Sequence, residues 1–206
     1  MWDEALNSFI ALFVVIDPIG TAPIFVALTA GAASADRRRF AVRGVLLGAV
    51  ILAVFAWAGE GLLSGIGISM PAFRIAGGLL LFLIAVDMLF EKRTERREKH
   101  SEQEIPDPSV FPLALPLIAG PGSITTVILL MDQHDGNLQG QMVVMGTLAA
   151  VLLVALTLLL LSGLIERLLR RTGVLVVTRL LGMLLAALAV QFVLDGLRGA
   201  ALMPTG

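Results

Sequence analysis

The first long apolar stretch of the chain is SFIALFVVIDPIGTAPIFVALT, residues 8–29. It is long enough to cross a bilayer, which takes about 20 mostly apolar residues. Asp17 is its only ionisable side chain. Pro18 and Gly20 interrupt a helix there, since proline lacks a backbone donor and glycine permits non-helical dihedral angles. The stretch therefore predicts a membrane helix that is broken at its middle.

The rest of the chain has the same apolar character. Of its 206 residues, 57% are hydrophobic and 15% are charged, and the mean hydropathy is +0.92. Such a composition is too apolar for a soluble domain with one core. Further stretches with almost no charge lie at 42–63, 72–90, 110–131, 142–165 and 174–195. We expect an all-α integral membrane protein of six transmembrane helices in the lipid bilayer, with no soluble catalytic or nucleic-acid-binding domain.

The positions of lysine and arginine predict the orientation in the membrane. These residues gather in the first, third and fifth connections, whereas the connections at 61–71 and 132–141 contain none. Cytoplasmic connections carry the excess of basic residues, so we expect both termini in the periplasm. The segment 91–109 is then a charged cytoplasmic loop. Because no basic region precedes the first stretch, we expect it to be an uncleaved span.

The sequence contains an internal repeat. Residues 16–21, IDPIGT, align with 118–123, IAGPGS, and residues 73–77, FRIAG, align with 178–182, TRLLG. The two matches have nearly equal separations along the chain, which indicates a duplicated three-helix unit. Three crossings reverse the direction of the second unit, so 1–90 and 110–206 are expected to form an inverted repeat. This architecture is common among secondary transporters.

The fourth stretch has its own interruption, at Pro116, Gly120, Pro121 and Gly122. Broken helices in a membrane face protein or a watery cavity, because lipid cannot satisfy their backbone groups. The N-termini of half-helices present free N–H groups and a positive dipole end, which suit a carboxylate. We predict a binding site where broken helices 1 and 4 meet at the membrane midplane. The alternative is that the prolines only kink packed helices.

Asp17 is the strongest single candidate for a functional side chain. A charge at such depth costs about 2.5–3.5 kcal/mol on insertion scales. Its carboxylate could take up a coupled proton, coordinate a cation or bind a substrate amino group. Alternatively, it caps the half-helix that follows. Ala119 occupies the aligned position in the second half, so the repeat geometry does not require this acid, and a single acid suits a coupling role.

Two arginines are candidates of second rank. Arg74 and Arg179 match within the repeat, and both lie a few residues inside a predicted span. Their alternative roles are structural. Each side chain could snorkel to the membrane interface, or the two could pair with Glu60 and Glu166, which precede them across each hairpin.

Other motifs give weaker signals. The glycine pairs Gly44–Gly48 and Gly61–Gly65 allow close helix contact, including contact in a homo-oligomer. His100 and His134 have no second ligand at metal spacing. Hydrolase and phosphate-loop motifs are also missing from the sequence. We therefore expect no enzyme, metal or cofactor, and any transport would draw on gradients rather than on a nucleotide.

Two segments, DPIGTAPIF at 17–25 and AGPGSITT at 119–126, resemble the paired signatures of the MarC family. The resemblance covers essentially the whole chain. It implies a bacterial inner-membrane protein related to the amino-acid exporter superfamily that includes lysine exporters, some members being regarded as transporters of glycine and alanine. By motif, it places the substrate site at Asp17, Pro18, Gly20, Thr21, Pro23, Gly120, Pro121, Gly122, Ser123, Thr125 and Thr126.

The sequence thus predicts a secondary transporter that holds a small amino acid between two broken helices, with proton coupling through Asp17. Two other hypotheses about the function stay open at this point. One is a membrane scaffold that transports nothing, and the other is a channel or exporter for a different small solute or ion.

Overall fold

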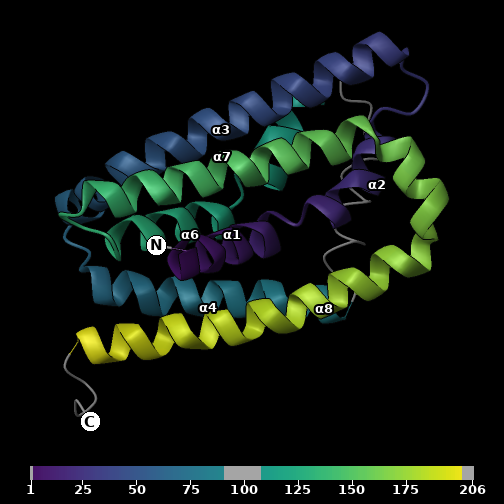
Figure 1. The fold of residues 1–206 in the computed structure, drawn as a ribbon. Coiled ribbons are helices and arrows are strands. Elements are labelled where there is room, and N and C mark those ends of the chain that lie inside the picture. The colour runs from purple at the N-terminus through teal and green to yellow at the C-terminus, as the bar shows by residue number, and fades with distance from the viewer. Residues whose placement is uncertain (1, 91–107, 201–206) are drawn as a thin grey trace.

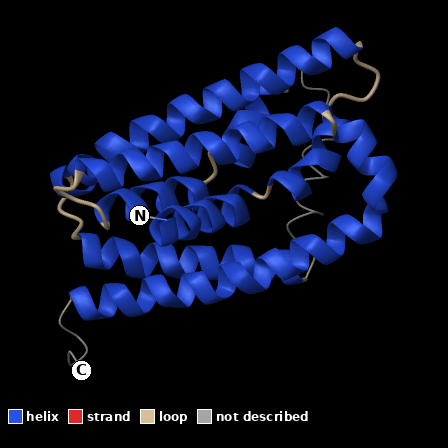
Figure 2. Ribbon diagram, in the orientation of Figure 1, coloured by secondary structure: helices blue, strands red, loops and turns tan. Residues whose placement is uncertain are grey.

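The computed structural model describes residues 2–90 and 108–200 (Figure 1). Every regular element in these two ranges is a helix (Figure 2). The elements are α1 (Trp2–Ile16), α2 (Pro18–Leu28), α3 (Ser34–Gly65), α4 (Met70–Leu89), η1 (Ser109–Ile118), α6 (Pro121–Asp132), α7 (Leu138–Leu160) and α8 (Ser162–Gly199). The predicted all-α class is confirmed. Most of the charged segment 91–109 lies outside the described residues.

Within the described residues, five helical segments are long and apolar enough to cross a membrane. They are Trp2–Leu28, Ser34–Gly65, Met70–Leu89, Leu138–Leu160 and Gly173–Gly199. The first combines α1 and α2, which only Asp17 separates. The remaining predicted stretch, 110–131, is divided between η1 and the shorter apolar helix α6.

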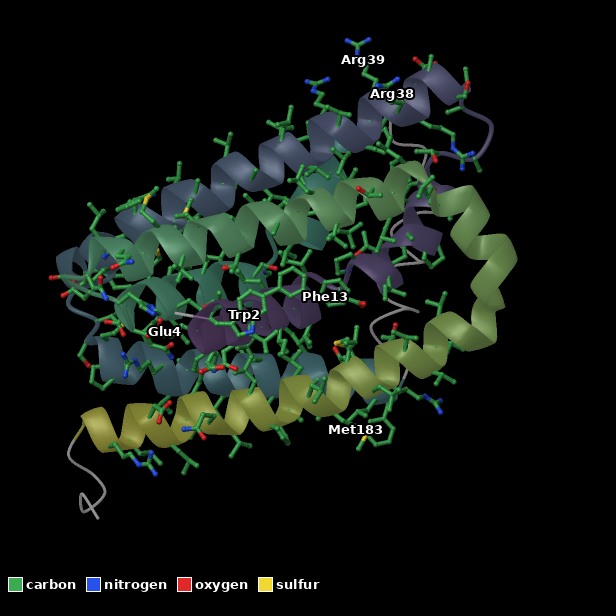
Figure 3. The ribbon with its side chains drawn as sticks, viewed as in Figure 1. Trp2, Glu4, Phe13, Arg38, Arg39 and Met183 are labelled. Carbon is green, nitrogen blue, oxygen red and sulfur yellow. The ribbon has the colours of Figure 1, made fainter. Side chains whose placement is uncertain are left out.

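Large apolar side chains point outward along the continuous helices. Val50 and Trp57 of α3, Leu83 of α4 and Leu153 of α7 are each more than half exposed. Met183 of α8 points away from the bundle and is 60% exposed (Figure 3). Soluble monomers rarely expose so much apolar surface, whereas lipid acyl chains can cover it at no cost.

The two broken segments occupy the centre of the bundle. In the most apolar part of Trp2–Leu28, 61% of residues are buried, against 22% to 33% in the other four spanning segments. Nearly all of α6 from Gly122 to Met131 is buried as well. Figure 1 shows α1 and α6 between a layer of α3 and α7 and a layer of α4 and α8. Continuous helices therefore shield the breaks from the surrounding lipid, as the sequence predicted.

Glycines let α3 lie close to η1 and α6. The backbone of Gly44 contacts the Leu113 side chain, and a Cβ built at Gly48 would lie 2.6 Å from Ile118 Cγ2. Side chains larger than hydrogen would force these helices apart. The predicted close contact at Gly44–Gly48 is therefore confirmed, and it lies within the chain. The other pair, Gly61–Gly65, has no neighbouring atom within 4 Å.

Helices α4 and α8 form an antiparallel pair with equally close backbones. A Cβ built at Gly78 would lie 2.7 Å from the carbonyl oxygen of Ala189. Near the other end of the pair, a Cβ at Gly182 would lie 3.2 Å from the carbonyl oxygen of Ala85. The pair thus packs with backbone against backbone, as small residues allow in membrane helices.

Candidate functional site

The first break centres on Asp17, which has the left-handed backbone angles φ 52° and ψ 63°. Its Oδ1 accepts a hydrogen bond from the backbone N–H of Gly20 at 3.0 Å, which caps the first turn of α2. Its backbone N–H donates to the Phe13 carbonyl at 2.9 Å, and its own carbonyl accepts from the Thr21 N–H at 3.0 Å. The side chain is 1% exposed. The capping role that the sequence left as an alternative is therefore present.

The local sequence explains why the helix breaks at this residue. Pro18 has no N–H, so it cannot donate to the Val14 carbonyl as a continuous helix requires. Aspartate tolerates the left-handed region better than most residues, because its short side chain bonds nearby backbone groups. A side chain at Gly20 would overlap the Asp17 carboxylate. The three residues together fix both the break and its cap.

The second break lies at Ala119 and Gly120, between η1 and α6. Gly120 has the extended angles φ −80° and ψ 169°, and no side chain caps the first turn of α6. The Ile124 N–H donates to the Gly120 carbonyl at 3.0 Å, so helical bonding starts there. Pro121 has no N–H to satisfy. The N–H groups of Gly122 and Ser123 precede the first intrahelical bond, and they are left for another acceptor.

The two breaks lie next to each other. A Cβ built at Gly122 would lie 3.1 Å from Cγ1 of Val15, which is two residues before Asp17. One turn further along α6, the methyl group of Thr125 contacts Gly77 of α4. The first turn of α6 thus packs against the last turn of α1. The structure brings together the interruptions of the first and fourth stretches.

Most of the predicted site residues are buried at this junction. Thr21, Ser123 and Thr126 are 3%, 2% and 0% exposed. Pro18, Gly20, Gly120, Gly122 and Thr125 are buried too, whereas Pro23 is half-buried and Pro121 is exposed. Within the described part of the chain, Thr126 Oγ1 is the buried side-chain atom that has no hydrogen-bond partner. An unpaired buried hydroxyl costs about 1–3 kcal/mol, so its presence asks for a functional reason.

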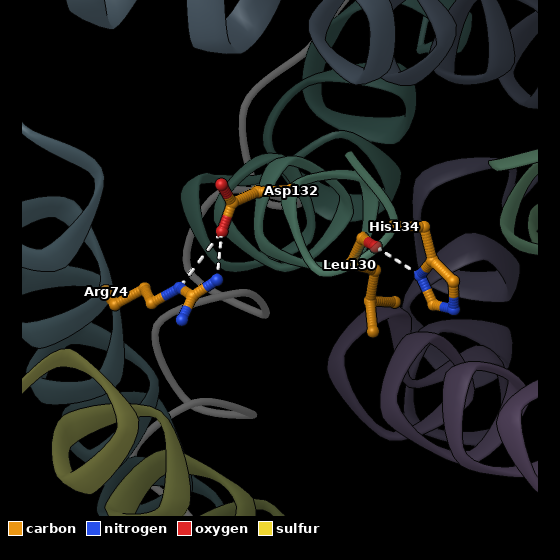
Figure 4. A network of polar contacts seen from close by, with 4 residues as sticks. All are labelled: Arg74, Leu130, Asp132 and His134. Atoms are coloured by element: carbon orange, nitrogen blue, oxygen red, sulfur yellow. Dashed lines mark hydrogen bonds and ion pairs between the residues drawn. The ribbon is translucent and has the colours of Figure 1, made fainter. Parts of the chain in front are cut away.

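Arg74 forms an ion pair that the sequence did not predict. Its Nε donates to Oδ2 of Asp132 at 3.0 Å, and its Nη2 donates to the same oxygen (Figure 4). The predicted partner Glu60 was wrong, because the arginine reaches across to the end of α6 instead of back along its own hairpin. Arg179 lies in α8. The side chain of its predicted partner, Glu166, is outside the described side chains.

A cavity of about 330 Å³ lies between α1, the end of α6 and α8. Figure 4 shows His134 turned toward α1, with Nδ1 2.9 Å from the carbonyl oxygen of Leu130. Val14 and Leu130 form the apolar wall of this cavity on the side of the two helix breaks. The polar residues of the lining are Glu4, Asn7, Ser8, Gln133, His134, Gln191 and Asp195. This cavity could not be predicted from the sequence, because its polar residues come from three segments that are far apart along the chain. No group of possible metal ligands occurs among the described residues.

Comparison with known proteins identifies the family. The sequence model for MarC family integral membrane proteins matches residues 2–201. The chain belongs to the MarC family.

Its relatives in this family match it over almost their full length. A UPF0056 membrane protein of Methanocaldococcus jannaschii is 37% identical, over 95% of this chain and 96% of its own. The UPF0056 membrane protein YvbG of Bacillus subtilis is 37% identical, over 97% and 96%. The UPF0056 inner membrane protein YhgN of Escherichia coli is 34% identical, over 95% and 97%. No solved structure gives a significant match.

Membership of the MarC family confirms the predicted family and makes this chain an integral membrane protein. The exposed apolar side chains of α3, α4, α7 and α8 are then its surface toward the lipid. The names of its relatives give no substrate, so the function has to be argued from the geometry of the two breaks.

Proposed function

We propose that this MarC protein is a secondary transporter of small zwitterionic amino acids, of the glycine and alanine class, in the bacterial inner membrane. The observation that carries the proposal is that the two helix breaks meet, and that one offers hydrogen-bond donors while the other offers a negative charge. The first turn of α6 offers unbonded N–H groups, and the Asp17 carboxylate lies at the adjoining break. The inner-membrane location rests on the name of the Escherichia coli relative.

In this proposal the junction binds the two ends of the zwitterion separately. The N–H groups of Gly122 and Ser123, at the positive end of α6, donate hydrogen bonds to the substrate carboxylate. The ammonium group is bound by Asp17 and by the hydroxyl groups of Thr21 and Thr126. The unpaired Thr126 hydroxyl supports this assignment, because a bound substrate would supply its missing partner.

Reciprocal packing of the two halves supports an inverted repeat of 1–90 and 110–206. Gly78 approaches the Ala189 carbonyl, and Gly182 approaches the Ala85 carbonyl. Gly78 and Gly182 are separated by as many residues as Ala85 and Ala189, so each contact maps onto the other under a two-fold rotation. Likewise, α3 packs on η1 and α6, while α7 packs on α1 and α2.

The same packing supports a sixth crossing. The segment formed by η1 and α6 runs beside α3, with Leu113 against Gly44 and Ile128 against Gly59. At 1.5 Å per residue, this part of α3 is about 22 Å long, which is most of the hydrocarbon thickness. We infer that η1 and α6 together cross the membrane as the predicted fourth span, antiparallel to α1 and α2.

The orientation is part of the proposal. Arg37, Arg38, Arg39 and Arg43 lie near the start of α3, and the positive-inside rule places that end in the cytoplasm. The cavity beside Asn7 and His134 then faces the periplasm, as do both termini. From that side it reaches Val14 of α1 and Leu130 of α6.

Uptake and counterflow of labelled glycine and alanine in liposomes test this function. We expect saturable flux above that of empty liposomes, with stimulation by an imposed pH gradient. Unlabelled glycine should compete. Glycine methyl ester, which lacks the carboxylate, and acetate, which lacks the ammonium group, should not compete. Conductance without saturation would favour a channel. Absence of flux from folded, inserted protein would favour a scaffold, and either result would overturn the proposal.

A further inference from the structure

A second cavity, of about 550 Å³, lies at the opposite end of the bundle. Figure 1 shows that α2 ends there, α3 begins there and α7 passes into α8. Phe25 and residues 159–161 form its apolar wall. Its polar lining consists of Ser34, Arg37, Arg38 and Ser162. None of these residues belongs to the candidate transport site.

The Arg37 side chain is held in place by a short chain of hydrogen bonds. Its Nε donates to Thr29 Oγ1 at 3.0 Å, and this hydroxyl donates to the Phe25 carbonyl at 2.7 Å. Thr29 is 2% exposed, so the anchor is buried. No acceptor for the two terminal nitrogens of Arg37 is found within the described residues. A guanidinium fixed through Nε presents those nitrogens to a ligand at little entropic cost.

Two further donors line the same space. Ser162 is 4% exposed, and it lines the cavity at the start of α8. No side chain caps the first turn of α3, where Ser34 lies. The first N–H groups of a helix need an acceptor from outside that helix. The cavity wall therefore collects donors from α3 and α8, together with two positive charges.

The charge balance favours an anion. Helices α3 and α8 begin at this end while α2 and α7 end there, so their partial charges of about half a unit each roughly cancel. Among the described residues that line the cavity, the charged side chains are Arg37 and Arg38, so the lining is positive. Asp36, the acid in the first turn of α3, is exposed and does not line the cavity. One carboxylate would leave the charge of one arginine without a counter-charge. A phosphate group carries more negative charge and has enough oxygens to accept hydrogen bonds from both guanidinium groups.

We propose that this cavity binds a phosphate group, which either an anionic lipid or a free phosphate compound supplies. In the orientation argued above, the site lies on the cytoplasmic side, where phospholipid headgroups are found. It is separate from the junction of the breaks, so binding here does not depend on the transport proposal.

Thermal unfolding of the purified full-length protein, titrated with inorganic phosphate, tests the site. We expect a saturable rise in melting temperature. Replacing one charged donor, in Arg38→Gln, should weaken the apparent affinity about tenfold. The matched control is Arg39→Gln, which removes the same charge from the adjacent residue outside the cavity and should leave the affinity unchanged. Figure 3 shows both arginines at the start of α3.

Three neutral substitutions keep the test decisive if Arg38→Gln does not fold. Thr29→Val removes the anchor of Arg37 without changing any charge, and Thr29→Ser restores the hydroxyl. We expect weaker phosphate binding in the first and wild-type binding in the second. Ser162→Ala should weaken binding by roughly threefold, the effect of one neutral donor.

Nanodiscs distinguish the two sources of phosphate. If a lipid occupies the site, phosphatidylglycerol in phosphatidylcholine discs raises the melting temperature and removes the response to added phosphate. If a free compound occupies it, the phosphate response is the same in both discs. Equal responses of Arg38→Gln and Arg39→Gln would show general charge screening and overturn the proposal. So would a wild-type protein that responds to neither phosphate nor phosphatidylglycerol.

Discussion

The two helix breaks lie side by side, but the chain completes them differently. At the first, the Asp17 carboxylate bonds the Gly20 N–H and neutralises the positive end of α2. At the second, Gly120 has no side chain, and the first turn of α6 is uncapped. The two interruptions align in the sequence at 16–21 and 118–123, where Asp17 corresponds to Ala119, so only the first break has an acid. One junction can therefore receive a positive group beside a negative group.

The backbone angles show that this difference does not follow from conformational need alone. Asp17 has a left-handed conformation, which costs a non-glycine residue about 1–2 kcal/mol. Gly120 has extended angles that any residue adopts. Glycine is therefore not required at position 120 by its dihedral angles, and what it contributes is the lack of a cap. The acid Asp17 thus has the unfavourable backbone conformation, whereas Gly120 has an ordinary one.

Asp17→Asn is the most severe test of this comparison. Asparagine also caps helices and tolerates the left-handed region, so the break should persist. The negative charge and the exchangeable proton are lost. We expect gradient-driven uptake of glycine in liposomes to vanish, while the melting temperature and the expression level stay near those of the wild type.

Asp17→Ala is the control that separates the two roles of this residue. Alanine cannot cap α2, so we expect a further loss of about 0.5–2 kcal/mol in the free energy of unfolding. If Asp17→Asn keeps full pH-dependent uptake, Asp17 is a cap alone, and proton coupling through it is wrong.

Thr126→Val examines the uncapped side of the junction. Valine replaces an unpaired buried hydroxyl by a methyl group of similar shape. We expect the free energy of unfolding to rise by about 1–3 kcal/mol, because an unsatisfied polar group leaves the interior. Glycine transport should fall at the same time. Denaturant unfolding in micelles and uptake in liposomes measure the two effects.

The matched control is Thr125→Val on the same helix, where the Thr125 methyl group already contacts Gly77. We expect a smaller gain in stability from it, because its hydroxyl is not among the unpaired buried atoms. Loss of stability in Thr126→Val would mean that its hydroxyl has a partner, and the substrate assignment of Thr126 would fail.

Gly120→Ser makes the second break resemble the first. A serine at this position can accept a hydrogen bond from the first turn of α6, which is worth about 0.5–2 kcal/mol of stability. The added oxygen then competes with a substrate carboxylate. We expect a higher melting temperature and a raised KM for glycine. Gly120→Ala adds the Cβ without the acceptor, so an equal rise in KM in that variant would point to steric exclusion instead.

Much of this arrangement could be predicted from the sequence, because the signals are local. Pro18, Gly20 and Pro121 lack a donor or a side chain whatever surrounds them, so the positions of both breaks were predictable. The cap at Asp17 was among the alternatives, since a carboxylate three residues before a free N–H is a local geometry. Apolar stretches of membrane length likewise predicted the five spanning segments of the described residues without knowledge of their neighbours.

The rest depends on contacts between distant parts of the chain. The partner of Arg74 is at Asp132 in the other half, and only the packing of α4 on α6 brings them together. The Glu60 prediction failed because it assumed pairing across one hairpin. The unpaired Thr126 hydroxyl and the hydrogen-bonded Arg37 side chain could not be predicted from the sequence either, because they also depend on tertiary contacts. Whether a polar group has a partner is decided by tertiary structure.

The Arg74–Asp132 ion pair extends the comparison to the far ends of the two half-helices. At its end, α6 is tied to α4 of the opposite half, whereas α2 ends at Thr29, which bonds Arg37 of its own half.

Because it is partly buried, the Arg74–Asp132 ion pair should stabilise the contact between halves by about 1 kcal/mol. A double-mutant cycle with Arg74→Gln and Asp132→Asn, read by denaturant unfolding, measures this coupling. If the pair also closes the end of the bundle that holds His134, both single variants should expose the cavity at His134 to a water-soluble histidine reagent faster than the wild type. A coupling energy near zero with unchanged labelling would make it a surface contact, and the two half-helices would then end alike.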